Sequence, residues 1–241
     1  MGILHKTTTA LAFAAFVSPA FAEGRIDTFT INAGQLVQAI YLNDAGAASQ
    51  LGALEAAIGE AGGEHLTNLE VIQNESQDHD MTHVVLLQWA DPSGRAALEA
   101  SDAWASVSDS VGSLGFFGAQ QDTPVELHED KIYDGTHAWT IAESPEQMAV
   151  VQQVLGVYFR SIGPVLQEYQ IGTKAFMGSA PGMDGGDFDV YAPQIFGLFE
   201  WQKLEDVERF RNDERWLEHV DIRNATFKRD EDTYFSRVIF E

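Results

Sequence analysis

Cysteine is absent from all 241 residues of this chain. Without a thiol the protein can form no disulfide, and thiol nucleophiles, thiolate metal sites and covalent c-type haem attachment are all excluded. A folded domain must therefore be stabilised by its packed core, for which the chain supplies 15 Phe and 5 Trp.

Positive charge is scarce. The chain has 14 Lys and Arg against 37 Asp and Glu, so its formal net charge is −23. A field of that sign repels nucleic acid and anionic lipid, and we expect no nucleic-acid partner. The acidity favours solubility and indicates an acidic surface, with a cationic ligand or partner as the alternative.

Several signatures of catalysis are also missing. The sequence contains no G-x-S-x-G elbow, no phosphate-binding loop, no dinucleotide fingerprint and no H-E-x-x-H pair. Each of these motifs places reactive groups or backbone amides where its chemistry needs them. Without these motifs, nothing in the sequence supports the hypothesis that the protein is a hydrolase, a kinase or a nucleotide-dependent dehydrogenase.

The N-terminus carries an apolar run of eight residues that begins at Ala10. Lys6 precedes the run, and Ala20 and Ala22 place small residues where a signal peptidase reads the chain. This is the three-part pattern of a secretory signal, and the run is far shorter than the roughly 20 residues of a spanning helix. We therefore expect a signal peptide over residues 1–22, cleaved after Ala22, and a periplasmic or secreted mature protein. No later segment reads as a membrane span.

An internal repeat is the strongest pattern in the sequence. Trp89 and Trp104 lie fifteen residues apart, and so do Trp201 and Trp216. The residues around the two pairs match as well when residues 86–104 are placed over 198–216. Two matched tryptophan pairs among only 5 Trp indicate that one unit occurs twice.

Strand and helix patterns around the two pairs follow one order. In the first half, the pattern predicts strands at residues 35–42, 66–73, 82–89 and 124–133, and helices at 45–59 and 91–108. In the second half, it predicts strands at residues 136–142, 167–177, 194–201 and 233–240, and helices from Ser144 onward and at 203–224. Ser144 and Gln147 have the spacing of a capping box. Each half then reads β-α-β-β-α-β, the ferredoxin-like arrangement.

This order predicts an α+β fold of two tandem ferredoxin-like repeats, residues 23–133 and 134–241. The strands at 82–89 and 194–201 are apolar on both faces, which is typical of strands that are buried on both sides. The simplest cover for each sheet is the other half of the chain. We therefore predict two sheets that form one intramolecular barrel with helices outside.

The segment at residues 196–224, FGLFEWQKLEDVERFRNDERWLEHVDIRN, resembles the third strand and second helix of the dimeric α+β barrel superfamily. It is most similar to small bacterial proteins of the antibiotic-biosynthesis-monooxygenase type. The resemblance implies a fused pseudo-dimer with an apolar pocket in each unit. It implies no activity, because relatives of this fold include cofactor-free and haem-degrading oxygenases, isomerases, cyclases and haem peroxidases.

Two histidines are the candidate catalytic residues. His137 and Trp139 lie two apart on a predicted strand and so point to one face. A histidine that faces a pocket could act as a general base or as an axial haem ligand. His83 aligns with Ile195 of the other half, so it is a candidate for a site in one half alone. For both histidines the alternative is a structural role with a satisfied hydrogen-bond partner.

Other residues are candidates for a ligand pocket or a metal site. The expected pocket residues are Trp139, Tyr158, Arg160, Trp89 and Trp201. Arg160 could hold a carboxylate ligand, although a surface ion pair is the plainer alternative. Asp184, Asp187 and Asp189 lie in a Gly-rich loop and could bind Ca²⁺, but their spacing does not match an EF-hand.

The sequence thus predicts an exported small-molecule-binding α+β barrel protein, with a cofactor-free oxygenase or an isomerase as the candidate enzyme classes. Its ligand would be small and apolar or aromatic. The alternatives are a non-catalytic periplasmic binding or interaction module and a haem-binding protein. Either a monomer or a homodimer fits, and the cofactor stays unknown.

Overall fold

A computed structural model of the chain describes residues 24–44, 46–76, 79–179, 194–228 and 232–240. Two expectations fall outside these residues: the signal peptide at 1–22, and the loop that carries Asp184, Asp187 and Asp189.

The described residues of the first half form six strands and three helices. The strands are β1 (Ile26–Ile31), β2 (Leu36–Leu42), β3 (Gly63–Asn74), β4 (His83–Trp89), β5 (Val111–Gly118) and β6 (Thr123–His128). The helices are α1 (Leu51–Glu60), α2 (Ser93–Glu99) and α3 (Asp102–Val107), with short 3-10 turns at Ala47–Gln50 and Ser108–Ser110. Leu54 and Ile58 give α1 a buried apolar face, as the helical spacing predicted.

In the second half, the part of the chain that the structure describes forms four strands and four helices. The strands are β7 (Ile132–Ala138), β8 (Gly172–Ser179), β9 (Ile195–Trp201) and β10 (Asp232–Val238). The helices are α4 (Pro145–Glu168), α5 (Leu204–Arg211), α6 (Glu214–Leu217) and α7 (Val220–Asn224). The predicted cap of α4 is confirmed, because the Ser144 hydroxyl accepts a hydrogen bond from the Gln147 N–H.

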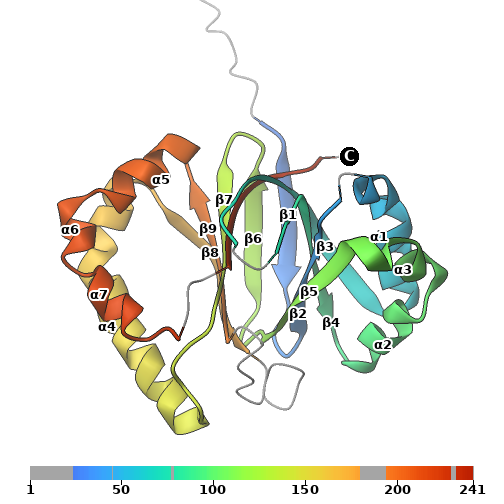
Figure 1. Cartoon of the computed structure of the whole chain (residues 1–241), viewed down its shortest axis with the longest axis horizontal. Coiled ribbons are helices and arrows are strands. Elements are labelled where there is room, and N and C mark those ends of the chain that lie inside the picture. Colours follow the sequence, from blue (N-terminus) through green and yellow to red (C-terminus); the bar gives the residue numbers. More distant parts are fainter. Residues whose placement is uncertain (1–23, 45, 77–78, 180–193, 229–231, 241) are drawn as a thin grey trace, which may run out of the picture.

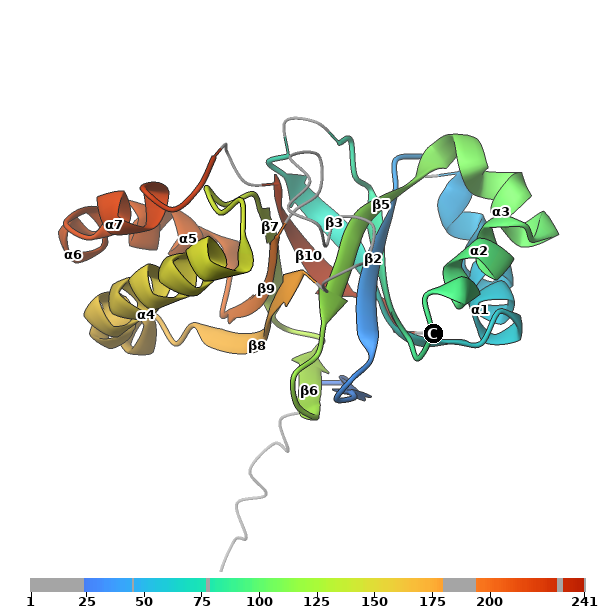
Figure 2. The same ribbon diagram turned by 90° about the horizontal axis from the view of Figure 1, so that it is seen from below.

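Eight of the strands close into an antiparallel barrel in the order β10-β3-β4-β2-β5-β8-β9-β7. Helices α1–α3 lie on one side of this barrel and α4–α7 on the opposite side (Figures 1 and 2). The barrel interior is filled by a hydrophobic cluster to which all eight strands contribute, including Leu86, Phe117, Phe196 and Tyr234. The predicted α+β class with an antiparallel sheet and outer helices is therefore confirmed.

Strands β1 and β6 form a separate antiparallel ribbon, of which only β6 lies within a predicted strand. Ile31, Val125 and Leu127 of this ribbon join the barrel's interior cluster. The buried Gln88 side chain ties the ribbon to β4, since it accepts from the Asn32 N–H at 3.0 Å and donates to the Thr30 carbonyl at 3.1 Å. The ribbon thus covers apolar barrel residues that would otherwise meet water.

Several predicted boundaries were wrong. The strand expected at 124–133 is two strands, β6 and the start of β7, with a turn at Asp130 between them. The expected division between residues 133 and 134 therefore falls inside β7. Helix α4 continues to Glu168, where a strand was expected, and both predicted long helices after the tryptophan strands are broken into shorter ones.

Helix α4 also corrects the membrane expectation. Over Glu146–Glu168 it is long and apolar enough, by length and composition, to cross a bilayer. One such helix is weak evidence of a span, because core helices of water-soluble proteins share these properties. Leu155 and Ile162 are buried against the second half's sheet, whereas Val150 and Val157 are exposed.

Candidate functional site

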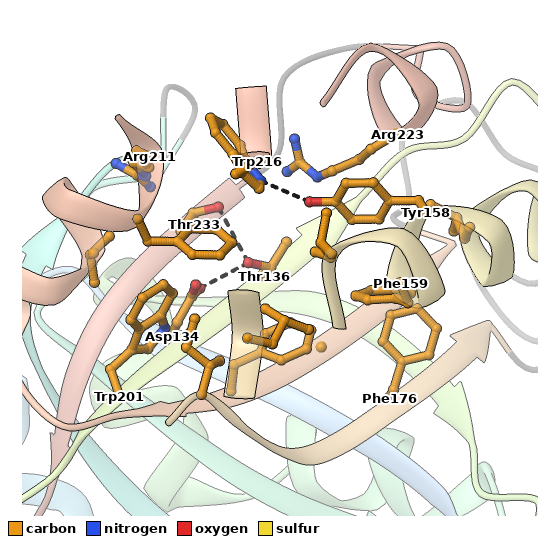
Figure 3. A pocket seen from close by; sticks show the side chains of 18 of the residues that line it. Asp134, Thr136, Tyr158, Phe159, Phe176, Trp201, Arg211, Trp216, Arg223 and Thr233 are labelled. Atoms are coloured by element: carbon orange, nitrogen blue, oxygen red, sulfur yellow. Dashed lines mark hydrogen bonds between the residues drawn. The ribbon is translucent and has the colours of Figure 1, made fainter. Parts of the chain in front are cut away.

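A cavity of about 140 Å³ lies between the second half's sheet and helices α4–α7 (Figure 3). Its wall is mostly apolar and rich in aromatic rings, including Phe159, Phe176, Phe199, Phe210 and Phe227. An apolar cavity of nearly this size in another protein holds a benzene molecule. The space therefore suits a single planar ring or a group of similar bulk.

The corresponding region of the first half holds a cluster of buried hydrophobic side chains. There the face of the sheet turned toward α1–α3 carries Ile40 on β2 and Val85 on β4, paired in register. The register of β7 and β9 places Thr136 and Gly197 at the corresponding positions. The second half thus has smaller side chains at this register position, where the first half has two branched aliphatic ones.

The two halves carry different polar side chains at one pair of equivalent strand positions, on β2 and β7. Gln38 lies two residues before Ile40, and its Oε1 accepts a hydrogen bond of 2.8 Å from the buried Trp89 indole. In the second half Asp134 takes this position, two residues before Thr136, beside Trp201. A neutral amide in a filled core is thus replaced by a carboxyl group that opens onto the cavity.

Burial raises the pKa of the Asp134 carboxyl to about 6, because desolvation penalises its charged form. Several groups oppose this rise. The Thr136 hydroxyl donates to the carboxyl at 2.9 Å, and the charges of Arg211 and Arg223 also lower the pKa. The Trp201 N–H has no hydrogen bond of good geometry among the described residues, but it is close enough to lower the pKa as well. Asp134 therefore changes charge close to neutral pH.

Two arginines line the cavity. Arg211, at the end of α5, donates to both carboxylate oxygens of Glu75 at 2.9 and 2.7 Å, and Glu75 follows β3 in the first half. Arg223 on α7 lies over the Phe227 ring at 5.2 Å and donates to Asn224 at 3.1 Å. Desolvation lowers the pKa of Arg223, so a cation is held here against the cost of burial.

A tyrosine–tryptophan pair completes the polar part of the wall. The Trp216 indole N–H donates to the Tyr158 hydroxyl at 2.9 Å, and Figure 3 shows Arg223 beside this pair. Burial raises the pKa of Tyr158, while the Arg223 charge and the Trp216 hydrogen bond lower it. Tyr158 therefore stays a neutral hydroxyl near neutral pH.

Only part of the predicted pocket set lies at this cavity. Tyr158 and Trp201 line it. Arg160 is exposed on α4 and does not line it. Trp89 is buried in the filled core of the first half, and Trp139 is buried just after β7, away from the cavity wall.

Neither candidate catalytic histidine lies in the cavity. His137 is fully buried inside the barrel, with its ring centroid 4.9 Å from Phe196 and 5.6 Å from Phe117. Neither of its ring nitrogens has a hydrogen-bond partner among the described residues, and desolvation lowers its pKa to about 3. His83 lies at the start of β4 in the first half, where its Nδ1 contacts the Thr82 hydroxyl at 3.1 Å. The two do not form one site.

The described residues of this cavity do not fit a haem group. No histidine lines the cavity, and its volume suits one ring rather than a macrocycle of four pyrroles. His137 is packed against aromatic rings and offers no open face for an iron. Among the described residues, no group of three or more His, Asp or Glu side chains converges as a metal site would require.

Sequence reasoning missed the three charged residues of the site. Asp134 was taken as the first residue of the second half, and Arg211 and Arg223 were given no role within the helix predicted at residues 203–224. One signal was available: the chain has only 14 Lys and Arg, and these two flank the repeated Trp216.

The sequence matches no model of a known protein family, and no curated protein matches it. Solved structures do resemble the fold. An anthrone oxidase-like protein superposes with a TM-score of 0.52 at 11% identity, covering 88% of this chain and 94% of its own. A chlorite dismutase variant from Candidatus Nitrospira defluvii gives 0.53 at 8% identity, covering 86% and 92%. At such identities the likeness concerns the fold alone, and this chain shares the α+β barrel fold of these proteins.

Proposed function

We propose that this protein binds a compact planar ligand in the cavity of its second half, and that Asp134 exchanges a proton with that ligand. The main support is a difference between the two halves at one register position. Gln38 lies in the hydrophobic core of the first half, whereas Asp134 lines the aromatic-rich cavity of the second. A carboxyl group desolvated inside a cavity is costly for stability, so its presence at this position supports a functional role.

The chemistry that best fits is general acid–base catalysis. A base works best when its pKa lies near the working pH, and the pKa of Asp134 is about 6. The ligand's C–H or O–H bond would break, its electron pair would stay on the ligand, and the proton would pass to the carboxylate. Isomerases that move a double bond and cofactor-free oxygenases both need such a deprotonated substrate.

Binding can be tested with benzyl alcohol as a neutral single-ring probe, followed by protein NMR. We expect it to shift resonances of cavity residues, and Thr136→Ile to abolish the shifts by filling the space as Ile40 does in the first half. The matched control is Ile40→Val, which changes the other half and should leave binding intact. Binding that survives in Thr136→Ile would place the ligand elsewhere and refute the proposal.

Proton exchange can be tested with acetophenone, whose methyl hydrogens are weakly acidic. In D₂O the protein should accelerate deuterium incorporation above the rate in buffer, and Asp134→Asn should lose that acceleration. If acetophenone binds without any acceleration, the cavity is a binding site only. The non-catalytic binding module, the second candidate function, would then be the better description.

Two further statements about the whole chain are proposals. We infer that it is a fused pseudo-dimer of two ferredoxin-like units, which the matched tryptophan pairs and the strand order of each half support. We also propose that it is exported after cleavage behind Ala22. Mass spectrometry of the mature chain from the source cells tests this, and a chain that begins at Met1 would refute it. A homodimer is compatible with these proposals.

A further inference from the structure

The Tyr158 hydroxyl carries a proton that no described residue accepts. The side chain is buried on α4, with 4% of its surface exposed, and it lines the cavity. Its oxygen accepts a hydrogen bond of 2.9 Å from the Trp216 indole N–H and makes no other hydrogen bond among the described residues. Arg223, which Figure 3 shows beside this pair, can only donate. An acceptor for the hydroxyl proton therefore has to come from a molecule in the cavity.

A buried hydroxyl proton without an acceptor costs free energy, because its hydrogen bond to water is lost and not replaced. A ligand that brings an acceptor oxygen removes this cost. Burial raises the pKa of Tyr158, so the group keeps its proton and acts as a hydrogen-bond donor. The Trp216 N–H occupies one side of the hydroxyl oxygen and keeps the O–H bond turned away from the indole.

We propose that the ligand is a ketone or a similar carbonyl compound on a planar ring, whose carbonyl oxygen accepts a hydrogen bond from the Tyr158 hydroxyl while Asp134 removes the proton of the adjacent C–H bond. This inference rests on the proposed function, since it names the substrate class of that same cavity and a second catalytic residue. Both side chains line a space of about 140 Å³, and Thr136 lies between them in Figure 3. A ligand that fills so small a space contacts both.

The two polar groups match the two parts of one functional group. A carbonyl makes the adjacent C–H bond acidic because it accepts the electron pair that the proton leaves behind. The proton passes to the Asp134 carboxylate, the C–H electron pair forms a C=C bond, and the carbonyl π pair moves onto oxygen. The resulting enolate carries its new negative charge on that oxygen. The Tyr158 hydroxyl therefore stabilises the enolate more strongly than the neutral ketone, which is what acceleration requires.

Acetophenone labelled with ¹³C at its carbonyl carbon tests the hydrogen bond directly, because the carbonyl resonance moves downfield when the oxygen accepts one. We expect the bound probe to resonate further downfield in the wild-type protein than in Tyr158→Phe. That variant should also bind acetophenone roughly three- to tenfold more weakly. It should bind ethylbenzene, which has a similar shape and no oxygen, as the wild type does.

Two further variants show whether the effect belongs to this hydroxyl. Trp216→Phe should move the carbonyl resonance partway toward its value in Tyr158→Phe, because the hydroxyl loses its orientation. Tyr169→Phe is the matched control, since the Tyr169 hydroxyl donates to Asp213 at 3.3 Å and the residue does not line the cavity. It should leave both the resonance and the affinity unchanged. In D₂O, Tyr158→Phe should slow deuterium incorporation into acetophenone by roughly a hundredfold or to the rate in buffer.

The outcomes separate the two proposals. Equal carbonyl resonances in the wild type and Tyr158→Phe overturn the hydrogen bond but leave the cavity as a ligand site. Equal losses of acetophenone and ethylbenzene binding also overturn it, because the hydroxyl then contributes packing alone. Deuterium incorporation that survives in Tyr158→Phe overturns the catalytic role of this residue. If neither probe binds the wild-type protein at millimolar concentration, the proposed function itself fails.

Discussion

The buried carboxyl of Asp134 leads to a prediction about stability that needs no ligand. Its pKa is about 6 in the folded protein, against an ordinary value of 3.8. The folded state therefore binds a proton more tightly than the unfolded chain does. Stability should fall as the pH rises from about 4 through 6, and it should level off above that pH. Each unit of pKa difference corresponds to about 1.4 kcal/mol, so the carboxylate lowers the free energy of unfolding by about 3 kcal/mol at pH 7.5.

The variant Asp134→Asn removes the charge while its Oδ1 can still accept the hydrogen bond from Thr136. We expect it to raise the free energy of unfolding by about 3 kcal/mol at pH 7.5 and to have almost no effect at pH 4. In a domain of this size each kcal/mol moves the melting temperature by roughly 2–4 °C. Urea unfolding followed by tryptophan fluorescence at both pH values measures the difference.

The matched control places a carboxyl in the filled half instead. Gln38→Asp puts the charge beside Trp89, among the buried hydrophobic side chains of the first half's core cluster. It should destabilise the protein more at pH 7.5 than at pH 4. An Asp134→Asn variant that is less stable at pH 7.5, or whose effect does not change with pH, would show that the arginines fully compensate Asp134 and would refute this reasoning.

Three other changes test the barrel and the ion pair, and a fourth, in helix α1, is a control. His137→Phe should leave stability unchanged or raise it by roughly 1–2 kcal/mol, because both buried ring nitrogens lack partners among the described residues; a loss in urea unfolding would show that an interior water satisfies them. Arg211→Met should cost roughly 1 kcal/mol at pH 7. That cost should vanish as the pH falls below 4.5, since the pairing lowers the pKa of Glu75. Gly135→Ala should cost roughly 1–3 kcal/mol, because a Cβ there would lie 2.1 Å from the Tyr234 ring. The open helix position Gly52→Ala should instead gain roughly 0.5–1 kcal/mol in thermal melts.

The tryptophan spacing predicted the architecture because it reports tertiary packing directly. Trp89 ends β4 and Trp201 ends β9, and Trp104 and Trp216 lie on the helices that follow. Strand β5 was missed for a physical reason: its sequence VGSLGFFG has a glycine at three of eight positions and no regular alternation.

The site was harder to predict than the fold. In the sequence alone, Asp134 resembles a turn residue. Its surroundings in the cavity include Thr136 and Gly197, which lie on two different strands. Its cationic neighbours come from α5 and α7, more than seventy residues away. The two histidines do not line this cavity, because the local sequence does not distinguish a strand position that faces the barrel interior from one that faces a ligand cavity.

The contrast between the halves can be tested by exchanging their residues. At positions equivalent to Val85 and Leu87, the second half has Gly197 and Phe199. The Phe199 ring lies over Gly197, where a Cβ would stand 2.5 Å from it. Gly197→Val alone should therefore destabilise the protein by roughly 1–3 kcal/mol through overpacking.

Adding Phe199→Leu restores the pair found in the first half and should recover most of that loss, with a coupling of roughly 0.5–3 kcal/mol between the two changes. The double variant should nevertheless fail to bind the benzyl alcohol probe, because it fills the cavity. Strictly additive effects in urea unfolding would mean that the ring does not depend on the glycine. The missing side chain at residue 197 would then not be the origin of the cavity. Recovery of stability together with loss of binding would show that a small number of residue differences between the halves produce the cavity. At the equivalent positions, the first half has a packed hydrophobic core.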